Sequence, residues 1–137
     1  MVDKSIYINP LTTRYTSKEM QHAFSDEKRF KLWRKLWIAL AESEMELGLN
    51  VTQEQVDELK AYADDIDYEL ASKFEREVRH DVMAHVYAYG KVAPSAAGII
   101  HLGATSCYVT DNADLVIYRD GLKYLRQTLS ARPLVLA

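Results

Sequence analysis

Apolar residues recur at intervals of three and four along most of the chain, and this spacing predicts an all-helical fold. The first series lies between Ser25, a candidate N-cap followed by two acids, and Gly48, a candidate C-terminal cap. Its members are Trp33, Leu36, Trp37, Leu40 and Ala41.

A second helix is predicted from local signals alone. Thr52 and Gln55 have the spacing of a capping box, and Val51 and Val56 occupy the two positions of a hydrophobic staple. A third helix is expected to open near Asp67 and to run through Leu70, Phe74 and Val78.

The triplet Arg79-His80-Asp81 interrupts this pattern. Asp81 can cap a new helix from Val82 to Tyr89 that ends at Gly90, and Pro94 can start only a short turn of helix.

The last segment has the pattern of a long bundle helix, whose apolar seam needs partner helices. The seam consists of Leu115, Tyr118, Leu122, Leu125 and Leu129. Arg132-Pro133 follows, and proline inside a helix costs about 3 kcal/mol. We therefore expect a final helix that is begun and cut short, with its bundle missing.

The stretch from Gly98 to Asn112, GIIHLGATSCYVTDN, has no clean helical or strand period. Its small residues let a backbone approach a ligand, and the hydroxyls of Thr105 and Ser106 at a helix entrance suit an anionic oxygen. The simpler interpretation is a hydroxyl-rich turn before the last helix, with Thr110 or Asn112 as its cap.

Composition narrows the class of protein. The 137 residues suffice for one domain, and a net charge of −3 argues against non-specific nucleic-acid binding. No apolar run is long enough to span a membrane. Cys107 is the single cysteine, so no disulfide framework exists, which fits a cytoplasmic location.

Three groups of residues are candidates for chemistry. In Arg79-His80-Asp81 the carboxylate can orient the imidazole for acid–base work, although a surface Arg, a capping Asp and a half-buried His explain the triplet more simply. Arg14-Tyr15 suits a phosphate, but a structural role is favoured for an isolated dipeptide. His101, on an apolar loop, is more often structural than catalytic.

A metal site is the weakest interpretation. His80-Asp81 is the kind of doublet that helical metal phosphohydrolases use. The other possible ligands do not fall at a spacing that specifies a metal. They are His22, His85, His101 and Asp111.

Taken together, the chain closely resembles the adenylosuccinate lyase family, within the fumarase/aspartase superfamily. Four segments have the order and spacing found in that family, and the resemblance covers almost all of residues 5 to 130. They are NPLTTRYTSKEM, FSDEKRFKLWRKLWIALAESEMELGL, RHDVMAHVYAYG and AAGIIHLGATSCYVTDN.

The resemblance implies β-elimination of fumarate from adenylosuccinate, giving AMP, and from SAICAR, giving AICAR, without cofactor or metal. It assigns Arg14 and Tyr15 to the nucleotide phosphate, and Arg79, His80 and Asp81 to substrate binding beside the reacting centre. It assigns Thr105 and Ser106 to the succinyl end.

The resemblance also implies an all-helical homotetramer whose active sites each draw on three subunits. It places the general-acid His and the general-base Ser beyond Ala137, so no catalytic residue is expected within residues 1–137. We expect an N-terminal helical domain over residues 1–111, the start of a truncated central bundle domain over residues 112–137, and no lyase activity from this segment alone. The ending SARPLVLA fits the family poorly, because Pro133 falls where the central helix should continue.

Two alternatives stay open from the residues. One is a helical metal-dependent phosphohydrolase built on His80-Asp81. The other is a non-enzymatic helical module that binds a partner helix through the seam between Leu115 and Leu129.

Overall fold

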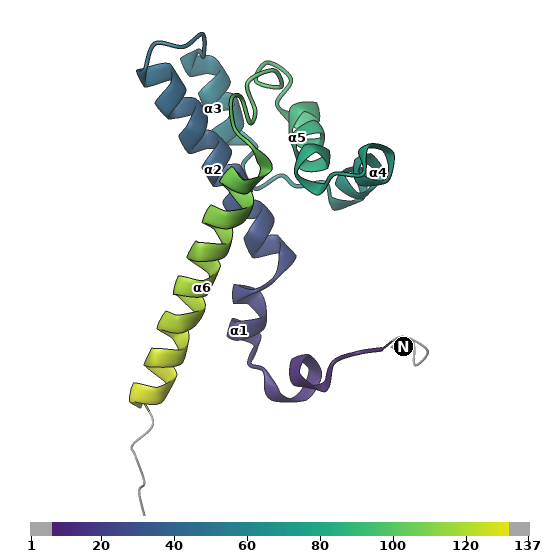
Figure 1. The fold of residues 1–137 in the computed structure, drawn as a ribbon, viewed down its shortest axis with the longest axis vertical. Helices are drawn as coiled ribbons and strands as arrows, with labels where there is room; N and C mark the ends of the chain where they lie inside the picture. The colour runs from purple at the N-terminus through teal and green to yellow at the C-terminus, as the bar shows by residue number, and fades with distance from the viewer. Residues whose placement is uncertain (1–6, 132–137) are drawn as a thin grey trace, which may run out of the picture.

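The computed structural model describes residues 7–131, and the regular elements in that range are all helical, as predicted (Figure 1). In order they are the π-helical turn η1 (Leu11–Tyr15), α1 (Lys18–Ala23), α2 (Asp26–Glu46), α3 (Gln53–Ala61), α4 (Tyr68–Val78), α5 (Asp81–Val92) and α6 (Ser106–Ala131). Arg132 and Pro133, where the sequence predicts an interruption, lie outside the described residues.

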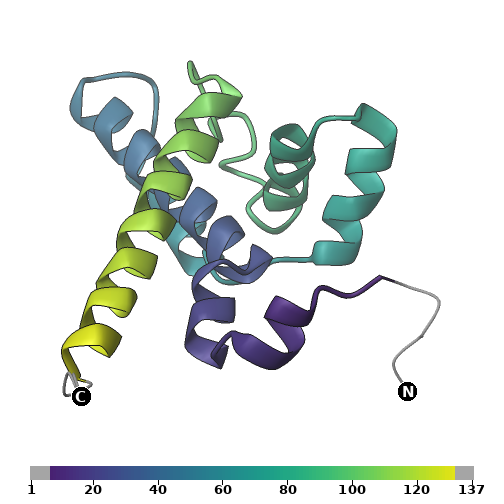
Figure 2. The same ribbon diagram turned by 60° about the horizontal axis from the view of Figure 1, so that its bottom comes forward.

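The core is built around α2, which the sequence predicts well. The Ser25 side chain accepts a hydrogen bond from the backbone N–H of Lys28, and Gly48 follows the helix with a left-handed φ of 81°. Trp33 and Trp37 are 2% and 1% exposed. Two views show α2 between α3 on one side and α6 on the other (Figures 1 and 2).

The capping box of α3 is confirmed. The Thr52 N–H donates to Gln55 Oε1 at 3.0 Å, and the Gln55 N–H donates to Thr52 Oγ1 at 3.3 Å. Val51 and Val56, the predicted staple, are both buried. Local sequence signals therefore place this helix correctly.

The N-cap of α5 is His80 rather than Asp81. Asp67 caps α4 as expected, but Arg79 then adopts a left-handed conformation with a φ of 53°. This turn leaves His80 extended, so that its Nδ1 accepts from the N–H of Met83 at 3.4 Å. Asp81 becomes the first helical residue, and its carboxylate accepts from the N–H of Val82 at 2.7 Å.

The prediction that α5 ends at Gly90 is wrong, because the helix continues to Val92. A Cβ at position 90 would lie 3.0 Å from the Cβ of Ala97. Glycine is required here so that the turn after the helix can pack back against it, and not to cap the helix.

The last helix begins at Ser106, earlier than the caps predicted at Thr110 or Asn112. Both of those side chains bond inside the helix, Thr110 to the carbonyl of Ser106 and Asn112 to the carbonyl of Tyr108. The stretch from Gly98 is therefore irregular only as far as Thr105. The predicted domain boundary between residues 111 and 112 falls within α6.

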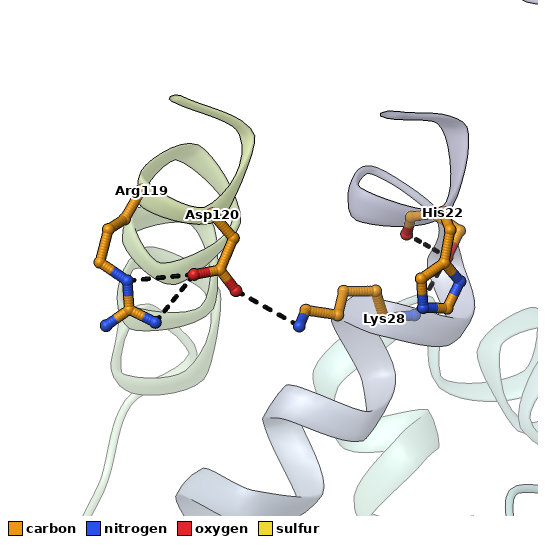
Figure 3. A network of polar contacts seen from close by, with 5 residues as sticks. His22, Lys28, Arg119 and Asp120 are labelled. Atoms are coloured by element: carbon orange, nitrogen blue, oxygen red, sulfur yellow. Dashed lines mark hydrogen bonds and ion pairs between the residues drawn. The ribbon is translucent and has the colours of Figure 1, made fainter. Parts of the chain in front are cut away.

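One side of α6 packs on α1 and α2. Figure 3 shows Lys28 of α2 reaching Asp120 of α6 at 3.3 Å, while Arg119 holds the same carboxylate at 2.9 Å. Gly121 is buried where a Cβ would lie 3.0 Å from the Phe24 ring. The predicted apolar seam lies on the exposed part of the helix, with exposures of 47–73%.

His85 is part of the core. It is 6% exposed and stacks on Phe30 with ring centroids 3.9 Å apart. Burial, helped by the charge of Arg34, lowers the pKa of His85 to about 4. The imidazole is therefore neutral at physiological pH and packs as an aromatic ring, in line with a local packing role.

The turn segment between α5 and α6 is anchored to α3. One carboxylate oxygen of Glu58 accepts from the N–H of Ser95, from its hydroxyl, and from the N–H of Ala96. The Gln55 amide donates to the Ser95 carbonyl at 2.8 Å. Glu58 therefore satisfies the donors at the start of a segment that has no regular structure.

We predict that Glu58→Ala destabilises the chain by about 1–3 kcal/mol, because three donors lose a charged acceptor. Urea unfolding followed by circular dichroism measures the change. Glu54→Ala, an exposed carboxylate on the same helix, is the matched control and should change stability by less than about 0.5 kcal/mol. Equal effects of the two variants would contradict the anchoring role.

We predict that His85 makes the fold acid-sensitive. Its folded pKa of about 4 lies below the unfolded value of 6.5, so the unfolded chain binds the extra proton first. Stability should fall as the pH drops from about 6.5 to about 4, by no more than about 3 kcal/mol. His85→Phe keeps the stack on Phe30 and should flatten this part of the pH profile. His22→Gln, on the exposed face of α1, should leave it unchanged.

Candidate functional site

The residues Arg79, His80 and Asp81 line an open depression of about 640 Å³ at the junction of α4 and α5. All three side chains are exposed. His80 Nδ1 lies 3.6 Å from Asp81 Oδ1, which is too long for a strong hydrogen bond. The junction therefore presents a cation, an imidazole and a carboxylate to one solvent-filled space.

The same depression is lined by Ser72, Glu75 and Arg76, which sequence reasoning missed. The signal was present, because these residues and Arg79 recur at intervals of three and four and so share one face of α4.

The two arginines of this site are available for an anion. Within residues 7–131, neither Arg76 nor Arg79 forms an ion pair or a side-chain hydrogen bond by the usual distance criteria. Arg79 also has its backbone in the left-handed region, which costs a residue with a Cβ about 1 kcal/mol or more. Strain of this kind is common at functional sites, where it aims a side chain.

Thr105 and Ser106 lie where the loop from Gly98 enters α6. Thr105 is exposed and Ser106 half-buried, and the Thr105 carbonyl accepts from the N–H of Tyr108 at 3.0 Å. The N–H groups of Ser106 and Cys107, ahead of this bond, are at the start of the helix, where N–H groups have no intrahelical partner. This arrangement suits a carboxylate or a phosphate.

His101 links this loop to the core. The Trp37 indole N–H donates to its Nδ1 at 3.0 Å. Burial lowers the pKa of His101, and the positive charge of protonated His80 lowers it further. The structural role predicted for His101 thus has a partner in Trp37.

Arg14 and Tyr15 are placed elsewhere. They lie on η1, which has no buried residue, and the Tyr15 side chain is 75% exposed. Figure 1 shows this purple turn beside α1, far from the teal α4–α5 junction. Of the predicted site residues, Arg79, His80 and Asp81 line one depression, while Arg14 and Tyr15 lie apart from it on η1.

The described residues offer little to a metal ion. Within residues 7–131, no group of three or more His, Cys, Asp or Glu side chains is placed to hold one. His85 and His101 are occupied by Phe30 and Trp37 respectively. A metal phosphohydrolase thus has no donor set in this part of the chain.

No helix in the described range is long and apolar enough to cross a membrane.

Comparison with known proteins identifies adenylosuccinate lyases among the relatives of this chain. The chain is 53% identical over 119 residues to an adenylosuccinate lyase of Schistosoma mansoni, covering 87% of this chain and 25% of that protein. It is 52% identical over 128 residues to that of Schizosaccharomyces pombe, covering 91% and 27%. It is 54% identical over 123 residues to that of Saccharomyces cerevisiae, covering 88% and 26%.

No family model matches the chain. The chain spans about a quarter of the length of the curated relatives it matches, with 25–27% of each covered. Identity above one half across nearly nine-tenths of the chain confirms the resemblance drawn from the sequence motifs. Over the residues that align, the chain is homologous to the adenylosuccinate lyases.

Proposed function

We propose that this chain supplies part of the substrate site of an adenylosuccinate lyase. The reaction is β-elimination of fumarate from adenylosuccinate to give AMP, and from SAICAR to give AICAR, in purine nucleotide biosynthesis. The observation that carries the proposal is the identity of more than half of the aligned residues to enzymes of that name. A cytoplasmic location is part of the proposal.

The exposed groups fit the charges of these substrates. Arg14 and Tyr15 bind the nucleotide phosphate in this proposal, and Thr105 and Ser106 bind a carboxylate of the succinyl group. Removal of a proton next to a carboxylate increases its negative charge in the transition state. Donors fixed in advance, such as the free N–H groups at the start of α6, stabilise that charge without reorganisation.

In this proposal the residues at the α4–α5 junction act beside the reacting carbon. The Arg79 guanidinium has no ion-pair partner within residues 7–131, and His80 and Asp81 share the depression with it. In the proposal these residues bind and orient substrate, and the general acid and general base come from parts of the enzyme outside this sequence. No metal or cofactor takes part.

The arrangement supports a site shared between subunits of a homotetramer. The η1 segment with its Arg-Tyr pair lies apart from the α4–α5 junction in one chain, which favours a site that draws on more than one copy (Figure 1). The exposed seam of α6 from Leu115 to Leu129 is suited to packing in a helical bundle. A bundle of this kind can bring groups from different copies together.

The interaction module remains the second candidate, because the same seam is apolar and exposed in this chain. It accounts for the seam alone. It does not account for the unpaired arginines at the α4–α5 junction or for the relatives.

We predict that the isolated 137-residue chain releases no fumarate from adenylosuccinate, since it carries binding groups without the acid and the base. Fumarate formation by purified chain, free of any full-length lyase, is the measurement. The full-length enzyme assayed in parallel serves as the positive control. Clear turnover by the chain would overturn the assignment of its residues to binding only.

We predict that Ser106→Ala in the full-length enzyme raises KM by roughly tenfold or more, because a hydroxyl hydrogen bond to a charged group contributes about 1.5–3 kcal/mol. Steady-state kinetics on adenylosuccinate measure the effect. Ser43→Ala is the matched control, since its hydroxyl bonds only to the Ala39 carbonyl on an exposed part of α2. An unchanged KM for Ser106→Ala would remove this residue from the site.

A further inference from the structure

The loop that enters α6 is tied to the core by one hydrogen bond between side chains that are far apart in sequence. The indole N–H of Trp37 donates to Nδ1 of His101 at 3.0 Å. Trp37 is 1% exposed and rigidly packed among aromatic rings, including Tyr89 at 6.1 Å between centroids. His101 therefore has a fixed point of attachment on α2.

The backbone path of the loop needs such an attachment. His101 has a φ of 66° and Gly103 a φ of 65°, both in the left-handed region. Glycine adopts this conformation freely, whereas histidine has a Cβ and pays about 1 kcal/mol or more. A strained residue keeps its conformation only where its surroundings hold it, and the hydrogen bond from Trp37 is the contact that does so here.

Further contacts lead from this anchor to the candidate ligand-binding residues. The Ala104 N–H donates to the His101 carbonyl at 3.3 Å, one residue before Thr105. Beyond Ser106, the Tyr108 hydroxyl donates to the carbonyl of Leu36, the residue next to Trp37. Two neighbouring residues of α2 thus hold the loop on both sides of its hydroxyl pair.

We propose that Trp37 and His101 are positioning residues, which hold the loop so that Thr105 and Ser106 face the anionic group of the substrate. The role assigned to the hydroxyls rests on the proposed function, while the anchor itself is a property of the fold. Because Nδ1 accepts, a neutral His101 carries its proton on Nε2, and only this tautomer keeps the contact.

The chain offers a matched control for the donor. Trp33 lies one helical turn before Trp37 and is 2% exposed, but its indole N–H has no hydrogen-bond partner among the described residues. Replacing either tryptophan by phenylalanine creates a similar cavity in α2. Only Trp37→Phe removes a hydrogen bond to the loop.

The acceptor has a conservative variant as well. Asparagine tolerates the left-handed region better than most residues, and its amide oxygen can accept from an indole N–H. His101→Asn should therefore keep much of the anchor. His101→Ala loses the acceptor and keeps the strain.

The experiment is hydrogen–deuterium exchange of the full-length protein, observed on the peptide that contains Leu102 and Ala104. Both amides are hydrogen-bonded within the loop. We expect exchange to be roughly five- to tenfold faster in Trp37→Phe and His101→Ala than in wild type, and close to wild type in Trp33→Phe and His101→Asn. Peptides from α3 report any general loss of stability.

Kinetics of the same variants test the link to substrate. Variants with faster hydrogen exchange in the loop should also have a higher KM for adenylosuccinate. In Trp37→Phe the increase should be roughly fivefold, with a smaller change in kcat. Equal loop exchange in Trp37→Phe and Trp33→Phe would overturn the anchor. Faster exchange with an unchanged KM would overturn the positioning role.

The experiments distinguish an error in the proposed function from an error in the anchor. A full-length wild-type protein without lyase activity refutes that proposal and the role of the loop in substrate binding. The comparison of exchange between the two tryptophan variants still decides whether the anchor exists.

Discussion

The burial of one face of α2 is the constraint on which the rest of the structure depends, because α3, α5 and the loop before α6 all contact it. Even a charged residue on this face, Arg34, is buried. Its guanidinium is 1% exposed and lies 3.4 Å from the centre of the Tyr89 ring. Burial lowers the pKa of Arg34 to about 10 and raises that of Tyr89 to about 12. The arginine stays charged and the tyrosine neutral, so the cation–π contact persists at any physiological pH.

The same face controls the candidate site, although it contributes no candidate residue. Trp37 holds His101, and Phe30 holds His85 on the helix that begins at the Arg79-His80-Asp81 group. Tyr89 ties α5 to α3 through a hydrogen bond of 2.6 Å to the Leu59 carbonyl. The positions of the exposed polar groups therefore follow from aromatic packing in the core. A change at such a buried residue is expected to reach the site without touching it.

Sequence reasoning succeeded where the determining signal is local and failed where it depends on packing. The capping box at Thr52 is complete within four residues, so the sequence alone predicts where α3 begins. Gly90 has the form of a helix stop, but its role depends on Ala97, which lies close only after folding. The start of α6 at Ser106 was missed because Thr110 and Asn112 bond to carbonyls inside the helix instead of capping it. The candidate residues themselves came from motifs and family resemblance, and the structure added the stripe of Ser72, Glu75 and Arg76.

The separation of the Arg14-Tyr15 segment from the other two groups is informative about assembly. The helices and loop that carry the groups at the α4–α5 junction and the α6 entrance are attached to the core through His85 and His101. The η1 turn has no buried residue and is attached mainly through hydrogen bonds from Gln21 to the carbonyls of Thr12 and Thr16. In one copy, this turn lies well apart from the α4–α5 junction (Figure 1). In the proposed function the Arg-Tyr pair of one copy therefore serves a substrate bound to a neighbouring copy, and the exposed apolar seam of α6 is suited to packing between copies.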